Sequence, residues 1–132
     1  MSKFSSVVSS FRSDSIRKAG EVRKAATIEL FRGVIMDTPV DEGRARGNWQ
    51  ATTENPATGQ LDIYDEDGRG TVAVATSVVT GSGDDQTLWL SNNLPYILGL
   101  EYGRSDQAPQ GMVRRNMARV ANNLRKHANQ VK

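Results

Sequence analysis

The sequence has 132 residues, a length typical of one domain, and 37% of them are hydrophobic. It contains no cysteine, which excludes a disulfide framework and a cysteine-based metal site. No apolar run reaches the roughly 18 residues of a membrane-spanning helix, and the Ser-rich start lacks the core of a signal peptide. We therefore expect a protein that is made in the cytoplasm and has no membrane partner.

Charge is distributed unevenly along the chain, although the formal net charge is only +2. Residues 1–36 carry seven Lys/Arg and three acids, residues 37–85 carry three and ten, and residues 86–132 carry seven and two. Basic ends thus flank an acidic middle. In a ring of identical subunits, the basic part of one copy would face the acidic part of the next. The alternative is that the ends are solvated helices and the middle is solvated loops.

The N-terminal region predicts an arm followed by a long helix. Residues 1–13 are dominated by Ser, Lys and Arg, a composition that predicts a flexible arm. Asp14 is a suitable N-cap for a helix at 15–36, where apolar residues recur at spacings of three and four. The helix is expected to end just before Thr38-Pro39, because the residue before a proline is disfavoured in a helix.

The middle of the chain predicts short strands separated by turns. Proline and glycine shape the segment 39–48, which has one short helical turn at 42–46. Strands are expected at 49–54, 61–64 and 86–91. Trp49 is expected to anchor the core. Residues 71–80 fit one face of a strand and one face of a helix equally well, and their β-branched content favours a strand.

The C-terminal third predicts two helices. Pro95 and Gly103 are the start and stop signals of a short helix at 95–102. A long helix with an apolar stripe and a basic face is expected at about 111–129. The order of elements predicts an α+β fold: a small antiparallel sheet packed against a long N-terminal helix and a long C-terminal helix, with short helices in the connections. Residues 14–132 are expected to form this single domain.

The side chains offer little catalytic chemistry. His127 is the only histidine, so one chain provides neither a histidine-based triad nor a multi-histidine metal site. The acids at 62–67 match an EF-hand loop only loosely, because no Glu stands at its twelfth position, and a solvated turn is the alternative. No phosphate-binding glycine loop is present. We therefore expect no enzyme activity, no metal and no cofactor.

The basic face of the last helix supports an alternative function, that of a small DNA-binding protein. Its arginines could contact phosphate groups, although no aromatic platform for stacking bases accompanies them. A solvated face, or a face that pairs with an acidic partner, explains the same pattern. The candidate DNA-facing residues are Arg114, Arg115, Arg119 and Arg125.

Two stretches of the sequence are more specific than these general signals. The first is TPVDEGRARGNW at 38–49. The second comprises LSNNLPY at 90–96, LEYGRS at 100–105 and QAPQGMVR at 107–114. Together they resemble the minor tail and tail-completion proteins of long-tailed bacteriophages, the neck proteins related to the phage lambda tail-completion protein. The resemblance covers most of residues 15–125.

This resemblance implies a structural role in the virion. Members of the family form rings, usually with six-fold symmetry, which complete the head-proximal end of the tail and join it to the head. The implied partners are copies of the chain itself, tail-terminator or tail-tube subunits, and head connector or adaptor subunits, with non-specific contact to genome DNA. The resemblance also favours a helix over a strand at 71–80.

Seven residues of the two stretches are expected to contact other subunits. Tyrosine provides rigid amphipathic contact surface, and arginine and glutamine supply polar contacts. The alternative is that these residues only cap elements and fill the core, as we expect for Trp49, Leu100 and Val113. The expected contact residues are Arg44, Arg46, Tyr96, Tyr102, Arg104, Gln107 and Gln110.

Overall fold

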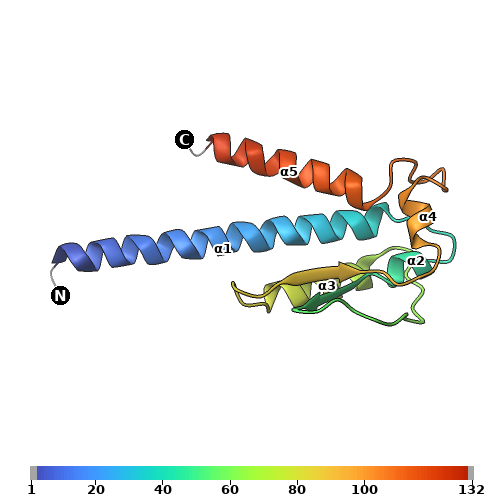
Figure 1. Cartoon of the computed structure of the whole chain (residues 1–132), viewed down its shortest axis with the longest axis horizontal. Coiled ribbons are helices and arrows are strands. Elements are labelled where there is room, and N and C mark those ends of the chain that lie inside the picture. The colour runs from blue at the N-terminus through green and yellow to red at the C-terminus, as the bar shows by residue number, and fades with distance from the viewer. Residues whose placement is uncertain (1–2, 131–132) are drawn as a thin grey trace.

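The structure is a computed structural model that describes residues 3–130. It has the expected α+β fold, with a small antiparallel sheet, two long helices and short helices in the connections (Figure 1). Within the described residues, the helices are α1 (Lys3–Asp37), α2 (Arg44–Gly47), α3 (Arg69–Thr80), α4 (Ile97–Glu101) and α5 (Val113–Gln130). The strands are β1 (Gln50–Thr53) and β2 (Leu88–Ser91).

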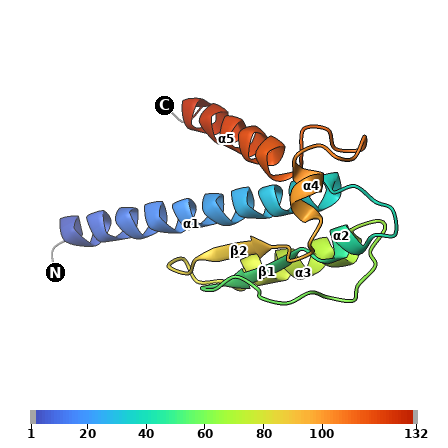
Figure 2. The same cartoon turned by 45° about the vertical axis from the view of Figure 1, so that its right-hand side comes forward.

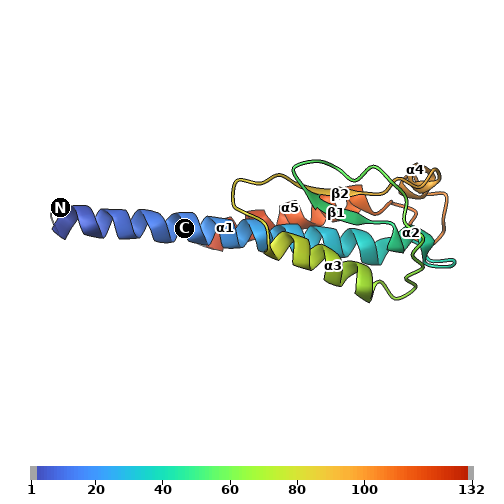
Figure 3. The same cartoon turned by 90° about the horizontal axis from the view of Figure 1, so that it is seen from below.

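Helix α1 is the central element of the fold. The sheet and α3 lie on one side of it, and α5 packs along the other side (Figures 1 and 2). Seen from below, α3 and the sheet lie next to each other along the C-terminal half of α1 (Figure 3). The N-terminal part of α1 extends beyond both α3 and the sheet. The C-terminal helix therefore packs on α1 from the side away from the sheet, where its Val120 is buried.

The two strands pair in antiparallel register, with Ala51 opposite Leu90 and Thr52 opposite Trp89. Leu88 and Leu90 are partly buried against the core, whereas Trp89 on the opposite face is 40% exposed. This alternation is typical of a strand, because successive side chains of a strand point to opposite faces.

The core forms where α1, α3, the sheet and the loop before α5 meet. Trp49 is buried, as expected, and its indole Nε1 donates a hydrogen bond to Thr38 Oγ1 at 2.8 Å. Thr38 Oγ1 in turn donates to the Val34 carbonyl at 2.6 Å. Both polar groups are thereby satisfied inside the core. Its buried residues are Phe31, Val34, Ile35, Trp49, Ala75, Val79, Ala108 and Met112.

The beginning of α1 differs from the expectation. The helix begins at Lys3, so residues 3–13 of the predicted arm are helical, while residues 1–2 lie outside the described part of the chain. Asp14 lies inside the helix and does not cap it, contrary to the prediction. Residues 3–19 contain neither glycine nor proline, so nothing in them stops the helix from continuing beyond its packed part. The flexibility of this region stays a prediction.

The strand predicted at 61–64 is wrong. These residues form an irregular segment, and the side chain of Asn48 takes the place of a neighbouring strand. The Asn48 Nδ2 donates to the Leu61 carbonyl at 3.0 Å, and its Oδ1 accepts the Leu61 N–H at 2.7 Å. Asn48 is fully buried. One amide side chain thus satisfies the backbone groups that a strand partner would have paired.

The segment 71–80, whose sequence fits both a strand and a helix, is part of helix α3. The side chain of Asp65 caps this helix. Its two oxygens accept the N–H groups of Gly68 at 3.0 Å and Thr71 at 2.9 Å, and also the Thr71 hydroxyl at 2.6 Å. This cap, together with burial of Ala75 and Val79, outweighs the strand preference of the β-branched residues.

A candidate assembly site between the two motif loops

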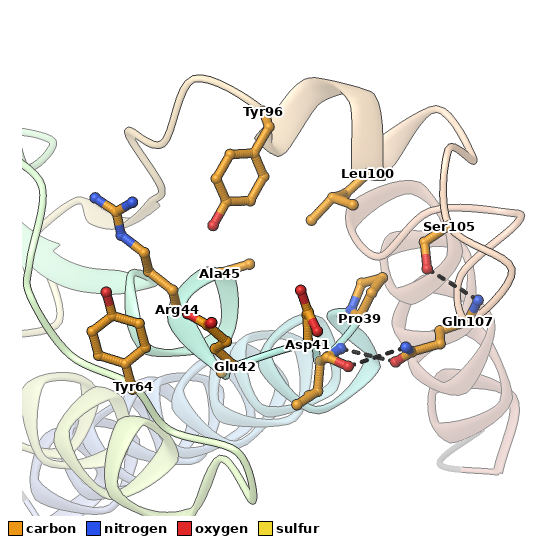
Figure 4. Close-up of a pocket in the computed structure, with 12 residues that line it drawn as sticks. Pro39, Asp41, Glu42, Arg44, Ala45, Tyr64, Tyr96, Leu100, Ser105 and Gln107 are labelled. Atoms are coloured by element: carbon orange, nitrogen blue, oxygen red, sulfur yellow. Dashed lines mark hydrogen bonds between the residues drawn. The ribbon is translucent and has the colours of Figure 1, made fainter.

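The two motif stretches meet at one end of the molecule and enclose a groove of about 420 Å³. Residues 39–45, which connect α1 to α2 and include the first two residues of α2, form one wall, and residues 96–107 around α4 contribute the other. In Figure 4, Tyr96 and Leu100 project into the groove toward Ala45 and the 39–42 segment. Segments that are far apart in the sequence thus form one surface feature.

Gln107 links the two walls within one chain. Its Oε1 accepts the Val40 N–H at 2.8 Å, and its Nε2 donates to the Val40 carbonyl at 3.1 Å (Figure 4). This reciprocal pair resembles the backbone pairing of two strands, and it fixes the distance between the loops. Gln107 therefore has an internal role, and its contact with another subunit stays a prediction.

Arg44 lines the groove together with Tyr64 and Tyr96. Its Nη2 donates to Gln60 Oε1 at 3.3 Å, but its Nε is buried and has no hydrogen-bond partner among the described residues. A buried donor without an acceptor costs about 1–3 kcal/mol. Because this Nε is closed to solvent, another molecule would meet only the rest of the half-buried Arg44 side chain, and the contact of Arg44 with another subunit stays a prediction.

Arg46, by contrast, is held inside the chain. Its guanidinium closes the C-terminal end of α1, where backbone carbonyls have no partner within the helix. It also ties this end to the loop before α3. The accepting carbonyls are those of Ile35 at 3.1 Å, Met36 at 2.7 Å, Thr38 at 3.1 Å and Glu66 at 2.5 Å. These bonds explain Arg46 as a clamp of the fold.

Glu101 is a key residue that the sequence analysis did not single out. Its Oε1 accepts the N–H groups of Met112 and Val113, both at 2.8 Å, and its Oε2 accepts the Arg114 N–H at 3.1 Å. The Arg114 Nε also donates to Oε2 at 2.9 Å. Partial burial raises the pKa of Glu101, but these hydrogen bonds outweigh it and lower the pKa below its ordinary value. Glu101 thus caps α5 from the end of α4.

The glycines of the second motif are required by this cap. Gly103 has φ 89° and Gly111 has φ 81°, a region that strongly favours glycine. A Cβ at Gly103 would lie 2.7 Å from the Pro109 carbonyl oxygen, and a Cβ at Gly111 would collide with the Glu101 carbonyl oxygen. The loop 102–111 therefore closes tightly on itself. Arg104 and Gln110 are exposed on it.

The surface around α4 exposes large apolar side chains. Leu98 is 68% exposed and Tyr102 is 70% exposed, and Tyr96 and Tyr64 are also exposed at the groove. Arg114 lies over the Tyr102 ring, 4.7 Å from its centroid. Exposed tyrosine and leucine gathered at one end are typical of protein–protein contact surfaces.

The four candidate DNA-facing arginines are not equivalent. Arg114 pairs with Glu101, and Arg119 pairs with Glu29 at 2.6 Å. Arg115 and Arg125 are exposed. Half of this basic set is therefore neutralised within the chain, which weakens the attraction that α5 can exert on phosphate groups.

The acidic segment at 62–67 has a structural explanation in the cap of α3 by Asp65. Partial burial of the Asp65 carboxylate raises its pKa, but the hydrogen bonds from Thr71 and Gly68 outweigh this effect and lower the pKa below its ordinary value.

Within residues 3–130, no group of three or more His, Asp or Glu side chains is placed to hold a metal ion. No helix in that range combines the length and apolar character that crossing a bilayer needs. His127 is exposed on α5.

Comparisons with protein-family models, with curated proteins and with solved structures give no match for this chain. The family resemblance therefore stays an expectation that rests on the two motif stretches alone. In the structure these stretches have a common location, because both contribute walls to the groove and the second one caps α5.

Proposed function

We propose that the protein is a structural subunit of the phage neck, which completes the head-proximal end of the tail and joins it to the head connector as part of a ring. The observation that carries this proposal is the convergence of the two motif stretches on one groove. A pair of motifs that resemble one family and share one surface fits a contact site better than two unrelated turns.

The composition of this end of the molecule supports an assembly role. Tyr96, Leu98 and Tyr102 offer apolar surface to a partner, and the Arg44 side chain lines the groove beside Tyr96. Hot spots of protein interfaces are enriched in tyrosine and arginine, which combine large contact area with fixed hydrogen bonds. The acids of the groove, Asp41 and Glu42, are exposed, as polar residues at the rim of a contact surface usually are.

The alternative, a DNA-binding protein that uses α5, has less support. Two of its four arginines are paired with Glu101 and Glu29, and the remaining two stand ten residues apart at positions 115 and 125. A gel shift at low salt tests it directly. Binding that weakens steeply with salt and depends on Arg115 and Arg125 would support DNA binding.

The proposed function is tested by deleting this gene in the parent phage and imaging the lysates. We expect filled heads and separate tails, and restoration of whole particles when the protein is supplied. Intact infectious particles without the protein would contradict the proposal.

Point variants connect the joining role to the α4 surface. Leu98→Asp places a charge in the exposed apolar surface and is expected to abolish joining without unfolding the chain. Met117→Asp is the matched control, because Met117 is similarly exposed, at 56%, but lies on α5. Equal loss of joining in both variants would show that the α4 surface has no special role.

A further inference from the structure

The groove has an acidic rim that the fold assembles from two segments. The Asp65 N–H donates to the Gly43 carbonyl at 3.0 Å, so the loop that carries Asp41 and Glu42 lies against the segment 62–67. Residues 41–67 contain seven acids and two arginines, and one of these arginines is the internal clamp Arg46. The exposed acids are Asp41, Glu42, Glu54, Asp62, Glu66 and Asp67.

Helix α5 carries the opposite charge. It contains five Lys/Arg and no acid. In its first half, Arg114 and Arg119 are neutralised by Glu101 and Glu29. In its second half, Arg125 and Lys126 are exposed, and neither forms an ion pair with any residue of the described range 3–130. Arg115, in the first half, also has no ion pair within this range, so two of the three unpaired basic residues of α5 lie in its C-terminal half.

The acidic rim of the groove and the C-terminal half of α5 both lie beside exposed apolar side chains. A hollow of about 230 Å³ separates α1 from the second half of α5, and Val22, Val120 and Leu124 line it. Val22 is 38% and Leu124 is 41% exposed. At the acidic end, Tyr64 and Tyr96 are exposed beside Asp41 and Glu42. Apolar residues with charges around them are the usual anatomy of a contact surface.

The two ends cannot meet within one chain. Helix α5 starts beside α4 and runs away from the groove, so its C-terminal end lies far from α2 (Figures 1 and 2). Its 18 residues correspond to about 27 Å at 1.5 Å per residue. Contact between two different surface patches of identical subunits closes into a ring or extends as a filament.

We infer, as an extension of the proposed function, that a second copy of this chain binds at the groove. The C-terminal end of α5, with Arg125 and Lys126, docks on the acidic rim that contains Asp41 and Glu42. Opposite charges orient the two copies, and Leu124 covers the exposed tyrosines of the groove. The subunits then associate head to tail.

The inference is tested with the purified full chain by sedimentation velocity and light scattering at low and moderate salt. We expect concentration-dependent association that weakens as salt screens the exposed charges. Two double variants each reverse the charge of one contact surface: Arg125→Glu with Lys126→Glu, and Asp41→Lys with Glu42→Lys. Each is expected to raise the dissociation constant of the association at least about tenfold. All four substitutions in one chain restore the association, and so does an equal mixture of the two double variants.

Arg32→Glu with Arg115→Glu is the matched control. It makes the same change of net charge as Arg125→Glu with Lys126→Glu, but at exposed residues that line another hollow between α1 and α5, and it is expected to leave association unchanged. Circular dichroism verifies that each variant keeps its helices. A chain that stays monomeric at several hundred micromolar, or four substitutions that fail to restore association, would overturn the inference.

The outcome is separable from that of the phage experiment. A monomeric chain that still joins heads to tails removes the head-to-tail contact and leaves the joining role of the proposed function intact. A chain that associates through these two ends, but whose deletion leaves the phage infectious, removes the proposed function and leaves the contact.

Discussion

The carboxylate of Glu101 accepts the backbone N–H of Met112 at 2.8 Å, so the last residue of α4 caps the beginning of α5. The same side chain also accepts the N–H groups of Val113 and Arg114. These bonds close the loop 102–111, which carries four of the seven expected contact residues. The position of this loop at the candidate assembly site therefore depends on Glu101 as well as on the bonds between Gln107 and Val40.

Glu101→Gln is expected to lower the free energy of unfolding by about 1–2 kcal/mol, because it removes the negative charge that the start of α5 and Arg114 stabilise. Urea unfolding followed by circular dichroism measures this change. Asp106→Asn is the matched control, since it removes the charge of an exposed acid in the same loop, and it should change stability by less than about 0.5 kcal/mol. Equal effects of both variants would contradict the capping role.

The pH dependence of stability follows from the lowered pKa values of Glu101 and Asp65. Each group binds its proton less readily in the folded chain than in the unfolded chain. Its contribution is therefore fully present above the ordinary carboxyl pKa of about 4 and is lost as the pH falls through the lowered value. We expect the free energy of unfolding to decrease below about pH 4, and to decrease less steeply in Glu101→Gln. Unfolding curves from pH 7 to pH 3 measure both slopes.

The elements of this fold that depend on local signals could be predicted from the sequence. Pro39 ends α1 close to the expected residue, and the alternation of Leu88, Trp89 and Leu90 gives the correct faces of β2. Trp49 is buried as its size and position indicate. In each case the deciding interaction lies within a few residues, so a pattern in the sequence contains it.

The remaining features depend on side chains that act over longer distances. Asn48 replaces a strand partner for Leu61, which lies 13 residues away, and Glu101 caps a helix that begins 12 residues later. Neither spacing is a known local pattern. The resemblance placed Arg44 and Arg46 in one group, although their contacts differ completely: Arg46 binds the end of α1, and Arg44 lines the groove.

Gly111→Ala is expected to destabilise the fold by at least about 2 kcal/mol. The substitution imposes a Cβ at φ 81°, and this atom would collide with the carbonyl oxygen of Glu101. Gly59→Ala is a suitable control, because a Cβ at Gly59 would meet no atom within 4 Å and its φ is not positive. Thermal unfolding of the two variants provides the comparison. Similar midpoints would mean that the loop adapts to the side chain and that the cap does not require glycine.

Arg44→Met and Arg46→Met should separate assembly from stability. Arg46→Met leaves the carbonyls at the end of α1 without their donor and is expected to cost about 2–3 kcal/mol of unfolding free energy. Arg44→Met removes a buried Nε that has no partner among the described residues, so stability should stay within about 0.5 kcal/mol of the wild type or increase.

The two variants should also differ in the phage assay. Arg44→Met is expected to reduce the joining of heads and tails at a temperature where the protein remains folded, because it removes a positive charge from the lining of the groove. Arg46→Met, supplied at a temperature low enough to keep it folded, should restore joining. Full activity of Arg44→Met would remove Arg44 from the assembly site, and the groove would then contribute through its tyrosines and acidic rim alone.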